Sequence, residues 1–389
     1  MSQIRLRSEP EFYNRGDIET RRDAIRMTKI RAAVCRAFGA PLVIEDVTLA
    51  PPGPNEIRVE VKACAICHSD ISAAAGDWGG TLPVVLGHEA AGIVAETGER
   101  VEGIRPGDRV VVTLIRSCGH CPACNERAHV YCAAPPALDA ATPISGKSGE
   151  TVLQGLYTGA FAEQVVVHES QVCVIDDDIP LASASLLACG VLTGLGAVVN
   201  TAQMPAGADA VVIGAGGVGL NAIQGAAIAG ARTAVAIDIA ADKLEAARRF
   251  GATHALDGRD PELAEKVRAL TGGRGASHVF VTVGAGPAFD QAMTLLRKGG
   301  ACVLVGMPAD GVTGTIPIAD FAAAGYRIIG SKMGSGRPKT DIPLLIDYYR
   351  QGRLKLDELV TGRYPLDEIN EAIASVRRGE ALRNVIVFD

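Results

Sequence analysis

A glycine-rich turn, "GAGGVG", constrains the fold of this chain more than any other feature. It follows the apolar run Val211–Ile213 and places Gly214, Gly216 and Gly219 in G-x-G-x-x-G spacing before a helical pattern. The first glycine permits a tight turn, the second lets a pyrophosphate approach the helix N-terminus, and the third allows close helix–strand packing. Asp238 ends the next apolar run, where a ribose-binding acid is expected. The pattern predicts a dinucleotide-binding unit, and the alternative is a glycine turn without a ligand.

The acid also indicates which nucleotide binds. A carboxylate at Asp238 repels the 2′-phosphate of NADP. No arginine that would accommodate this phosphate follows at 239–241. The sequence therefore favours NAD.

Strand-like and helix-like runs alternate from Ala208 to Lys332. This alternation is typical of an α/β fold with a doubly wound parallel sheet, the Rossmann arrangement. The expected strands are 209–214, 233–238, 253–257, 277–283, 301–306 and 326–332, and the expected helices are 217–230, 241–250, 260–271 and 287–297.

Residues 30–180 have a different pattern, in which short alternating runs such as 56–63, 107–115 and 161–175 lie between turns. We expect an irregular, mostly β domain here. Helices at 341–352 and 366–379 and a final strand, "NVIVFD", follow the nucleotide domain, and we expect this tail to rejoin the first domain. The predicted division is an N-terminal extension at 1–28, a mostly β domain at 29–190 and 333–389, and an inserted nucleotide domain at 191–332.

Charge and hydropathy argue against some partners. The formal net charge of −6 disfavours nucleic acid, which requires a basic face. No uninterrupted apolar run has transmembrane length, and the nearest candidate, 211–231, is interrupted by glycines and polar residues. The N-terminus lacks the apolar core of a secretory signal. We expect a cytoplasmic protein with neither a nucleic-acid nor a membrane partner.

Four of the ten cysteines lie in one short stretch, "CGHCPACNERAHVYC". Four thiolates complete a tetrahedral zinc shell and leave no position for a substrate, so this site is expected to be structural. An iron–sulfur cluster and a redox switch are the alternatives. His120 and His129 in the same loop are possible substitute ligands, although we expect them to be solvated. The expected ligands are Cys118, Cys121, Cys124 and Cys132.

A catalytic zinc needs three protein ligands and one open position. Cys67, His88 and Cys189 supply such a Cys₂His set. Taken singly, each cysteine is more often a buried small side chain, and the histidine a core residue. The sequence alone leaves open whether residues so far apart meet.

The chain from about Lys29 onward resembles the zinc-dependent medium-chain alcohol dehydrogenases. The resemblance rests on "CHSD", "GHEAAGIVAETG", the four-cysteine loop, "CGVLTG", and "GAGGVG" followed by "AIDI". It implies a GroES-like catalytic domain joined to a Rossmann domain. It also implies two zinc ions per chain, one catalytic and one structural, as in the long-loop members of the family.

The family's roles carry over to individual residues. The resemblance makes Cys67, His88 and Cys189 the catalytic zinc ligands and Ser69 the hydroxyl that receives the alcohol proton. Around them, Asp70 is implied to orient His88, and Glu89 is a further nearby carboxylate. The implied cofactor contacts are His68, Thr193, Gly214, Gly216, Gly217, Val218, Gly219, Asp238, Lys243 and Arg383. Trp78 and Leu114, and by a weaker analogy Phe161, are assigned to the substrate pocket.

The implied reaction is hydride transfer between a primary or secondary alcohol and NAD, giving an aldehyde or ketone. Ser72 stands where many members have a histidine that passes the proton to solvent, so the proton relay must end differently. An S-(hydroxymethyl)glutathione (formaldehyde) dehydrogenase is an alternative, weakened because Pro136 replaces an arginine of that branch. A non-catalytic, zinc-stapled nucleotide-binding protein is the alternative from another class. The long loop favours a homodimer, with a tetramer as the other option.

Overall fold

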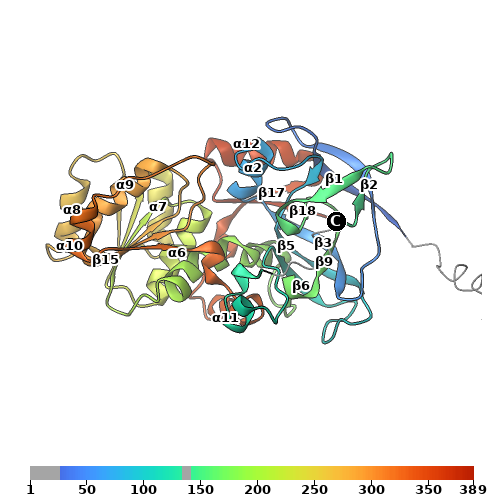
Figure 1. The fold of residues 1–389 in the computed structure, drawn as a ribbon, viewed down its shortest axis with the longest axis horizontal. Coiled ribbons are helices and arrows are strands. Elements are labelled where there is room, and N and C mark those ends of the chain that lie inside the picture. The colour runs from blue at the N-terminus through green and yellow to red at the C-terminus, as the bar shows by residue number, and fades with distance from the viewer. Residues whose placement is uncertain (1–26, 134–141) are drawn as a thin grey trace, which may run out of the picture.

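The computed structural model describes residues 27–133 and 142–389. Figure 1 shows two bodies side by side, a helix-covered sheet at one end and a β-rich body at the other. Most of the predicted N-terminal extension, residues 1–28, lies outside the described residues, as does Pro136.

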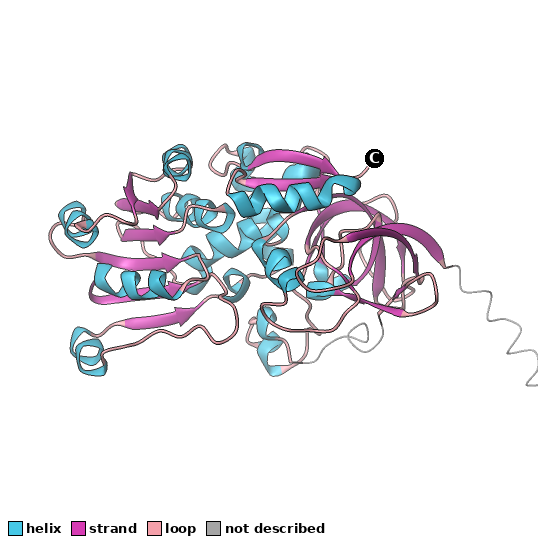
Figure 2. Cartoon of the chain, turned by 90° about the horizontal axis from the view of Figure 1, so that it is seen from above, coloured by secondary structure: helices cyan, strands magenta, loops and turns pink. Residues whose placement is uncertain are grey.

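The nucleotide domain contains a six-stranded parallel sheet in the order β13-β12-β11-β14-β15-β16. In chain order this is 3-2-1-4-5-6, which confirms the predicted doubly wound fold class. Figure 2 shows these strands stacked at one end of the molecule. The strands are β11 (Asp209–Ile213), β12 (Thr233–Asp238), β13 (His254–Asp257), β14 (Ala276–Val281), β15 (Leu296–Leu304) and β16 (Arg327–Gly330). The helices are α6 (Gly217–Ile228), α7 (Ala241–Arg249), α8 (Leu263–Leu270), α9 (Gly286–Leu295) and α10 (Ile318–Ala324).

Three details of this domain differ from the sequence prediction. Strand β15 begins at Leu296, not at 301, because α9 ends at Leu295 and the next backbone is already extended. Helix α10 was not predicted. Strand β16 ends at Gly330, and Lys332 begins a short helical turn, η7 (Lys332–Ser335), in place of the last predicted strand residues.

The other domain combines a closed barrel, β1-β2-β7-β8-β4, with a seven-stranded sheet that includes β10-β6-β5-β3-β18-β17 and β9. Strand β18 pairs antiparallel with β3. A segment from the end of the chain therefore completes a sheet that contains strands from its first part. The strands are β1 (Thr28–Cys35), β2 (Val43–Leu49), β3 (Glu56–Ala65), β4 (Val84–Val85), β5 (Glu89–Thr97), β6 (Arg109–Thr113), β7 (Ile144–Ser145), β8 (Thr151–Gln154), β9 (Gln164–His168), β10 (Val172–Val174), β17 (Val360–Pro365) and β18 (Arg383–Val387). The helices are α2 (His68–Ala75), α3 (Pro122–Asn125), α11 (Pro338–Arg350) and α12 (Ile369–Arg378).

A buried helical segment connects the two domains. It consists of α4 (Leu181–Ser185), the turn η5 (Leu186–Ala188), α5 (Gly190–Gly196) and a π-helical piece, η6 (Ala197–Thr201). One hydrophobic cluster contains side chains of this segment and of both domains. Within 27–133 and 142–389, no single helix is long and apolar enough to cross a membrane. One bent pair, Leu181–Ala188 with Gly190–Thr201, meets the length and composition test, but most of its residues are buried inside the protein.

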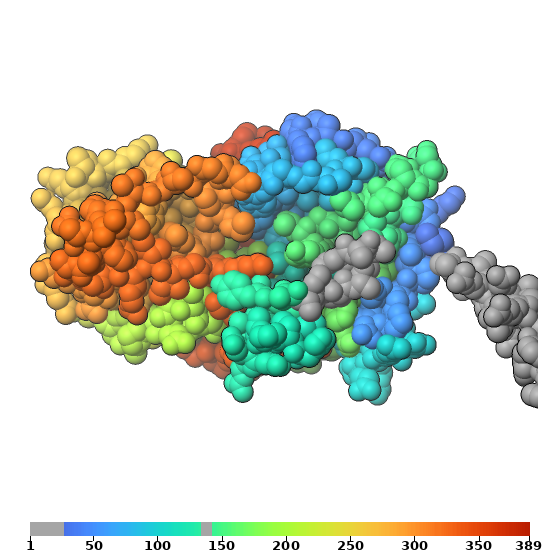
Figure 3. All heavy atoms as spheres, viewed as in Figure 1, coloured from blue at the N-terminus to red at the C-terminus, as the bar shows by residue number. Residues whose placement is uncertain are grey.

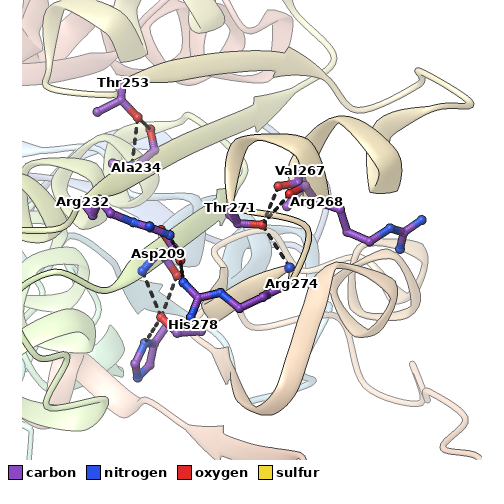
Figure 4. Close-up of polar contacts among 11 residues, drawn as sticks. Asp209, Arg232, Ala234, Thr253, Val267, Arg268, Thr271, Arg274 and His278 are labelled. Carbon is purple, nitrogen blue, oxygen red and sulfur yellow. Dashed lines mark hydrogen bonds and ion pairs between the residues drawn. The ribbon is translucent and has the colours of Figure 1, made fainter.

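A polar cluster joins the N-terminal ends of strands β11 and β14 (Figure 4). The buried carboxylate of Asp209 accepts hydrogen bonds from Arg232 at 2.6 and 2.8 Å. The Ser277 hydroxyl donates to the Asp209 carbonyl at 2.8 Å and lies 3.0 Å from Nδ1 of His278. Burial, together with repulsion from Arg327 and Arg297, lowers the pKa of His278 to about 4. The neutral imidazole is therefore the form that the folded sheet accommodates.

This lowered pKa predicts a pH-dependent stability. The unfolded state gains a proton below its ordinary histidine pKa of about 6.5, whereas the folded state resists protonation down to about 4. The stabilisation is thus present above pH 6.5 and is lost as the pH falls from 6.5 toward 4. After allowance for partial hydration, we expect His278 to account for a loss of about 1 kcal/mol between pH 7 and 5.

Urea unfolding at both pH values would measure this loss. The free energy of unfolding of His278→Gln should fall less between pH 7 and 5 than that of the wild type. The matched variant His254→Gln, on the edge strand β13, should behave like the wild type. An identical pH dependence in all three proteins would contradict the assignment to His278.

Candidate active site

Four potential metal donors meet where the β domain joins the connecting helices. The ligand atoms of Cys67, His88, Glu89 and Cys189 all lie within 4.8 Å of one another, and all four residues are buried. Cys67 is the N-cap of α2, and Cys189 occupies the break between η5 and α5. His88 directly precedes β5 and Glu89 begins it. The fold therefore brings together the three residues that the sequence assigned to a catalytic zinc.

Asp70 fixes two of these donors. One of its carboxylate oxygens lies 2.9 Å from His88 Nδ1 and also accepts the amide proton of Gly87 at 2.9 Å. The other oxygen accepts the amide proton of Cys67 at 3.2 Å. Nε2 of His88 is left buried without a hydrogen-bond partner, as a metal-binding nitrogen would be.

Negative groups around these donors, among them Asp70, would stabilise a bound cation. A hydrogen bond from Cys189 lowers the pKa of Cys67 well below its usual range, and the same bond raises the pKa of Cys189. Although burial opposes it, the charge of Asp70 raises the pKa of His88 well above its ordinary value. Two sulfurs, one imidazole nitrogen and a carboxylate are ligands that Zn²⁺ favours, so the residues present fit zinc.

Arg383 connects this donor set to the glycine turn. Its Nη2 lies 2.5 Å from Oε2 of Glu89, and both side chains are almost fully buried. A Cβ added at Gly190 would lie 2.2 Å from Arg383 Nη1, and one added at Gly217 would lie 2.4 Å from its Cδ. The arginine therefore passes between two glycines, one beside Cys189 and the other in the nucleotide turn. Burial raises the pKa of Glu89 to about 7, although the charge of Arg383 opposes the rise.

The glycine turn has the predicted backbone geometry. Gly214 has a φ of +94°, a conformation that L side chains rarely adopt. A Cβ at Gly219 would lie 1.8 Å from the Gly214 carbonyl oxygen, whereas a Cβ at Gly216 would meet no atom within 4 Å. Asp238 accepts amide protons from Ala215 at 2.7 Å and Ala240 at 3.0 Å, so its carboxylate is fixed beside the turn.

Comparison with known proteins identifies the family. Residues 53–177 match the alcohol dehydrogenase GroES-like domain, and residues 217–349 match the zinc-binding dehydrogenase family. Alcohol dehydrogenase B of Mycobacterium tuberculosis is 36% identical over 371 residues, which cover 92% of this chain and 98% of that protein. The chain belongs to the zinc-dependent medium-chain alcohol dehydrogenase family. The NDMA-dependent alcohol dehydrogenase of Amycolatopsis methanolica is also 36% identical, over 92% of this dehydrogenase and 99% of its own length.

A solved structure has the same fold. The alcohol dehydrogenase zinc-binding domain protein from Burkholderia ambifaria superposes with a TM-score of 0.89 at 33% identity, covering 93% of this chain and all of that one. The predicted family and fold are thus confirmed, and the protein is an oxidoreductase of the alcohol dehydrogenase family.

The cysteine loop of the dehydrogenase forms a separate donor set. Sγ atoms of Cys118, Cys121, Cys124 and Cys132 lie within 4.8 Å of one another. The backbone amide of Cys121 donates to Cys118 Sγ at 3.3 Å, and that of Cys118 donates to Cys132 Sγ at 3.3 Å. Backbone hydrogen bonds lower the pKa of Cys121 to about 6. Four cysteine sulfurs are the complete ligand set of a closed zinc site.

The remaining predicted cofactor residues lie around the turn. Thr193, one helical turn after Cys189 on α5, has its Oγ1 3.7 Å from Cys189 Sγ. Val218 packs half-buried against the shared hydrophobic cluster. Partial loss of hydration and repulsion from Arg383 and Lys243 lower the pKa of His68, although His68 keeps much solvent exposure. The neutral imidazole of His68 and the two cations Arg383 and Lys243 therefore gather at one end of the site.

The predicted substrate residues have different surroundings. Ser69 follows Cys67 closely on α2 and is half-buried, as is Leu114, which packs against the shared cluster. The indole Nε1 of Trp78 donates to the Pro308 carbonyl at 2.9 Å, a contact between the two domains. Phe161 does not line a pocket. Its side chain is fully buried in the core of the β domain, and its backbone amide donates to Leu86, so that prediction was wrong.

Met333 is a site residue that sequence reasoning missed. Its Sδ lies 3.6 Å from both Cys189 Sγ and Thr193 Oγ1. The only sequence signal is the serine- and glycine-rich stretch "GSKMGSG", which predicts a turn but not its location.

The arrangement around Asp70 predicts a specific loss of zinc. Replacing Asp70 with Asn removes one charge that orients His88, and such changes typically weaken metal binding by about 10–100-fold. Zinc retention during chelator titration would measure the effect, with zinc at the cysteine loop as the internal reference. Asp77→Asn, an exposed change just beyond α2, is the matched control. Equal retention in both variants would refute the role of Asp70.

Proposed function

We propose that this dehydrogenase transfers a hydride between a primary or secondary alcohol and NAD, giving an aldehyde or ketone. The observation that carries the proposal is the position of Arg383. Its guanidinium contacts a carboxylate of the metal donor set and its side chain packs on the nucleotide turn. Arg383 thus connects the metal donor set to the turn that would bind the nucleotide.

Cys67, His88 and Cys189 would hold the catalytic zinc, and the four loop cysteines would hold a structural zinc. When bound, the catalytic zinc supplies Lewis acidity that lowers the pKa of an alcohol hydroxyl. Asp70 keeps Nδ1 of His88 occupied, so that Nε2 faces the other donors. The carboxylate of Glu89 lies close enough to bind the zinc as a further ligand or to balance the charge of the ion.

The nucleotide would lie along the glycine turn. Gly216 leaves room for a pyrophosphate near the start of α6, where free amide groups point outward. Nε of Arg383 is buried without a hydrogen-bond partner and would be satisfied by a phosphate oxygen, with His68 nearby. Asp238 would accept the ribose hydroxyls and repel a 2′-phosphate, and Lys243 would lie near the same ribose. When bound, NAD supplies the hydride acceptor.

Ser69 would receive the alcohol proton, since its hydroxyl follows Cys67 by two positions on the same helix. Ser72, also on α2 and half-buried, holds a hydroxyl in place of an imidazole. It can pass a proton but cannot store a positive charge near neutral pH. We therefore propose that the relay ends in water or a ribose hydroxyl. Thr193 and Val218 would hold the nicotinamide, while Trp78 and Leu114 would line the pocket for the alcohol.

Replacing Cys67 with Ser tests the catalytic metal. We expect alcohol-dependent NAD reduction to fall by at least about a thousand-fold, ~4 kcal/mol, because the donor set loses a thiolate. Zinc content should fall from two per chain to one, while NAD binding stays close to that of the wild type. Cys173→Ser changes a buried cysteine outside both donor sets and should keep both metals. Near-normal turnover of the Cys67 variant, measured over a panel of primary, secondary and aromatic alcohols, would exclude this mechanism.

Two glycine variants test the nucleotide site. Gly216→Ala should fold normally, because its Cβ meets no atom within 4 Å, but NAD affinity should fall about ten-fold, ~1.4 kcal/mol. Gly219→Ala should instead destabilise the fold by about 1–3 kcal/mol, since its Cβ would clash with the Gly214 carbonyl. Calorimetric NAD titration and thermal unfolding separate the two effects. Unchanged NAD affinity in Gly216→Ala would argue against binding at this turn.

A further inference from the structure

The turn that follows the last strand of the Rossmann sheet has an unfavourable backbone. Met333, Gly334 and Ser335 have successive φ values of 50°, 62° and 50°, all in the left-handed region. Two of these residues carry a Cβ, which the left-handed conformation places too close to a carbonyl oxygen. Such a conformation persists only where the surroundings enforce it, and it is often found at functional sites.

The connecting helices enforce this conformation. Oγ1 of Thr201 lies 2.9 Å from the Ser331 hydroxyl and 2.8 Å from the Ser335 hydroxyl, so one side chain holds both ends of the turn. A Cβ at Gly334 would lie 2.3 Å from the Leu192 carbonyl oxygen, and one at Gly196 would lie 2.5 Å from the Gly334 oxygen. The turn is therefore pressed backbone to backbone against α5.

This close contact brings a thioether to two functional atoms. Met333 Sδ is 3.6 Å from Cys189 Sγ and 3.6 Å from Thr193 Oγ1, and these two atoms are 3.7 Å apart. The three atoms form a nearly equilateral triangle. Met333 is only 8% exposed, so little water competes for the threonine hydroxyl.

We propose that Met333 is a positioning residue, which holds the Thr193 hydroxyl against the sulfur of Cys189. This inference rests on the proposed roles of Cys189 as a zinc ligand and Thr193 as a nicotinamide contact. A thioether accepts hydrogen bonds only weakly and donates none. The Thr193 hydroxyl lies within reach of both sulfurs and can donate to Met333 Sδ or to Cys189 Sγ. A zinc-bound thiolate would be the stronger, charge-assisted acceptor, so the confined hydroxyl would then donate to Cys189. Met333 thus sets the electron density that Cys189 gives to the metal and the position of Thr193 beside the nucleotide.

The cysteine loop lies behind the same turn. Its short helix η1 (His129–Tyr131) contacts η7, and Val130 belongs to the same hydrophobic cluster as Met333 and Cys189. Figure 3 shows the teal surface of this loop beside the orange part of the nucleotide domain. The loop therefore also packs against the turn that carries Met333.

The test compares Met333→Leu with the matched variant Met204→Leu. Both methionines are buried in the same cluster, but Met204 makes no sulfur contact with either donor set among the described residues. Each protein is prepared with zinc and with Co²⁺ in its place. For Met333→Leu we expect a shifted thiolate-to-cobalt charge-transfer absorption and a kcat lower by about ten-fold, the lower end of the effect of lost ligand support. KM for the alcohol, zinc content and the thermal midpoint should match those of Met204→Leu.

The outcomes separate the positioning role from simple packing. Met333→Leu with the cobalt spectrum of the wild type would overturn the proposal, whether or not turnover falls. If Met333→Leu fails to fold, Ser335→Ala, which removes one hydrogen bond that holds the turn, should shift the same absorption by a smaller amount, and an unshifted band would again overturn it. Wild-type protein without alcohol-dependent NAD reduction would instead refute the proposed function, while the cobalt spectra would still decide the role of Met333.

Discussion

The ion pair between Glu89 and Arg383 is the interaction on which the rest of the site depends. Both charges lie away from water, a costly placement that is tolerated only because the two groups compensate each other. Arg383 reaches Glu89 only because Gly190 and Gly217 lack side chains. The pair therefore fixes the distance between the loop that carries Cys189 and the turn that binds the nucleotide.

Helix starts supply much of the local chemistry. Cys67 and Cys121 are the N-caps of α2 and α3, where free amide groups favour a thiolate, and the pKa of each thiol is lowered. Asp70 uses the same geometry at α2, since its carboxylate accepts the Cys67 amide and also lies against His88. At these positions, the start of a helix therefore also prepares the side chains that could bind a metal.

Features encoded by short spacings could be predicted from the sequence. The glycine turn, the parallel sheet and the grouping of the four loop cysteines depend on residues close in the chain. The meeting of Cys67, His88 and Cys189 depends on the tertiary fold, and only the family resemblance indicated it. Met333 was missed because its role depends on a left-handed turn packed on α5. Phe161 was misplaced because an aromatic ring suits a core and a pocket equally well, and the backbone path decides between them.

The pairing of β18 with β3 has a consequence for the order of folding. Val385 lies opposite Ala65, so a sheet of the first domain is closed by a strand that follows the whole nucleotide domain. The entropic cost of closing so long a loop is reduced if the intervening segment is already compact. The Rossmann sheet, made of neighbouring βα units, can supply that compact segment first. Arg383 lies at the start of β18, so the charge that joins metal and nucleotide sites arrives in one of the last steps of assembly.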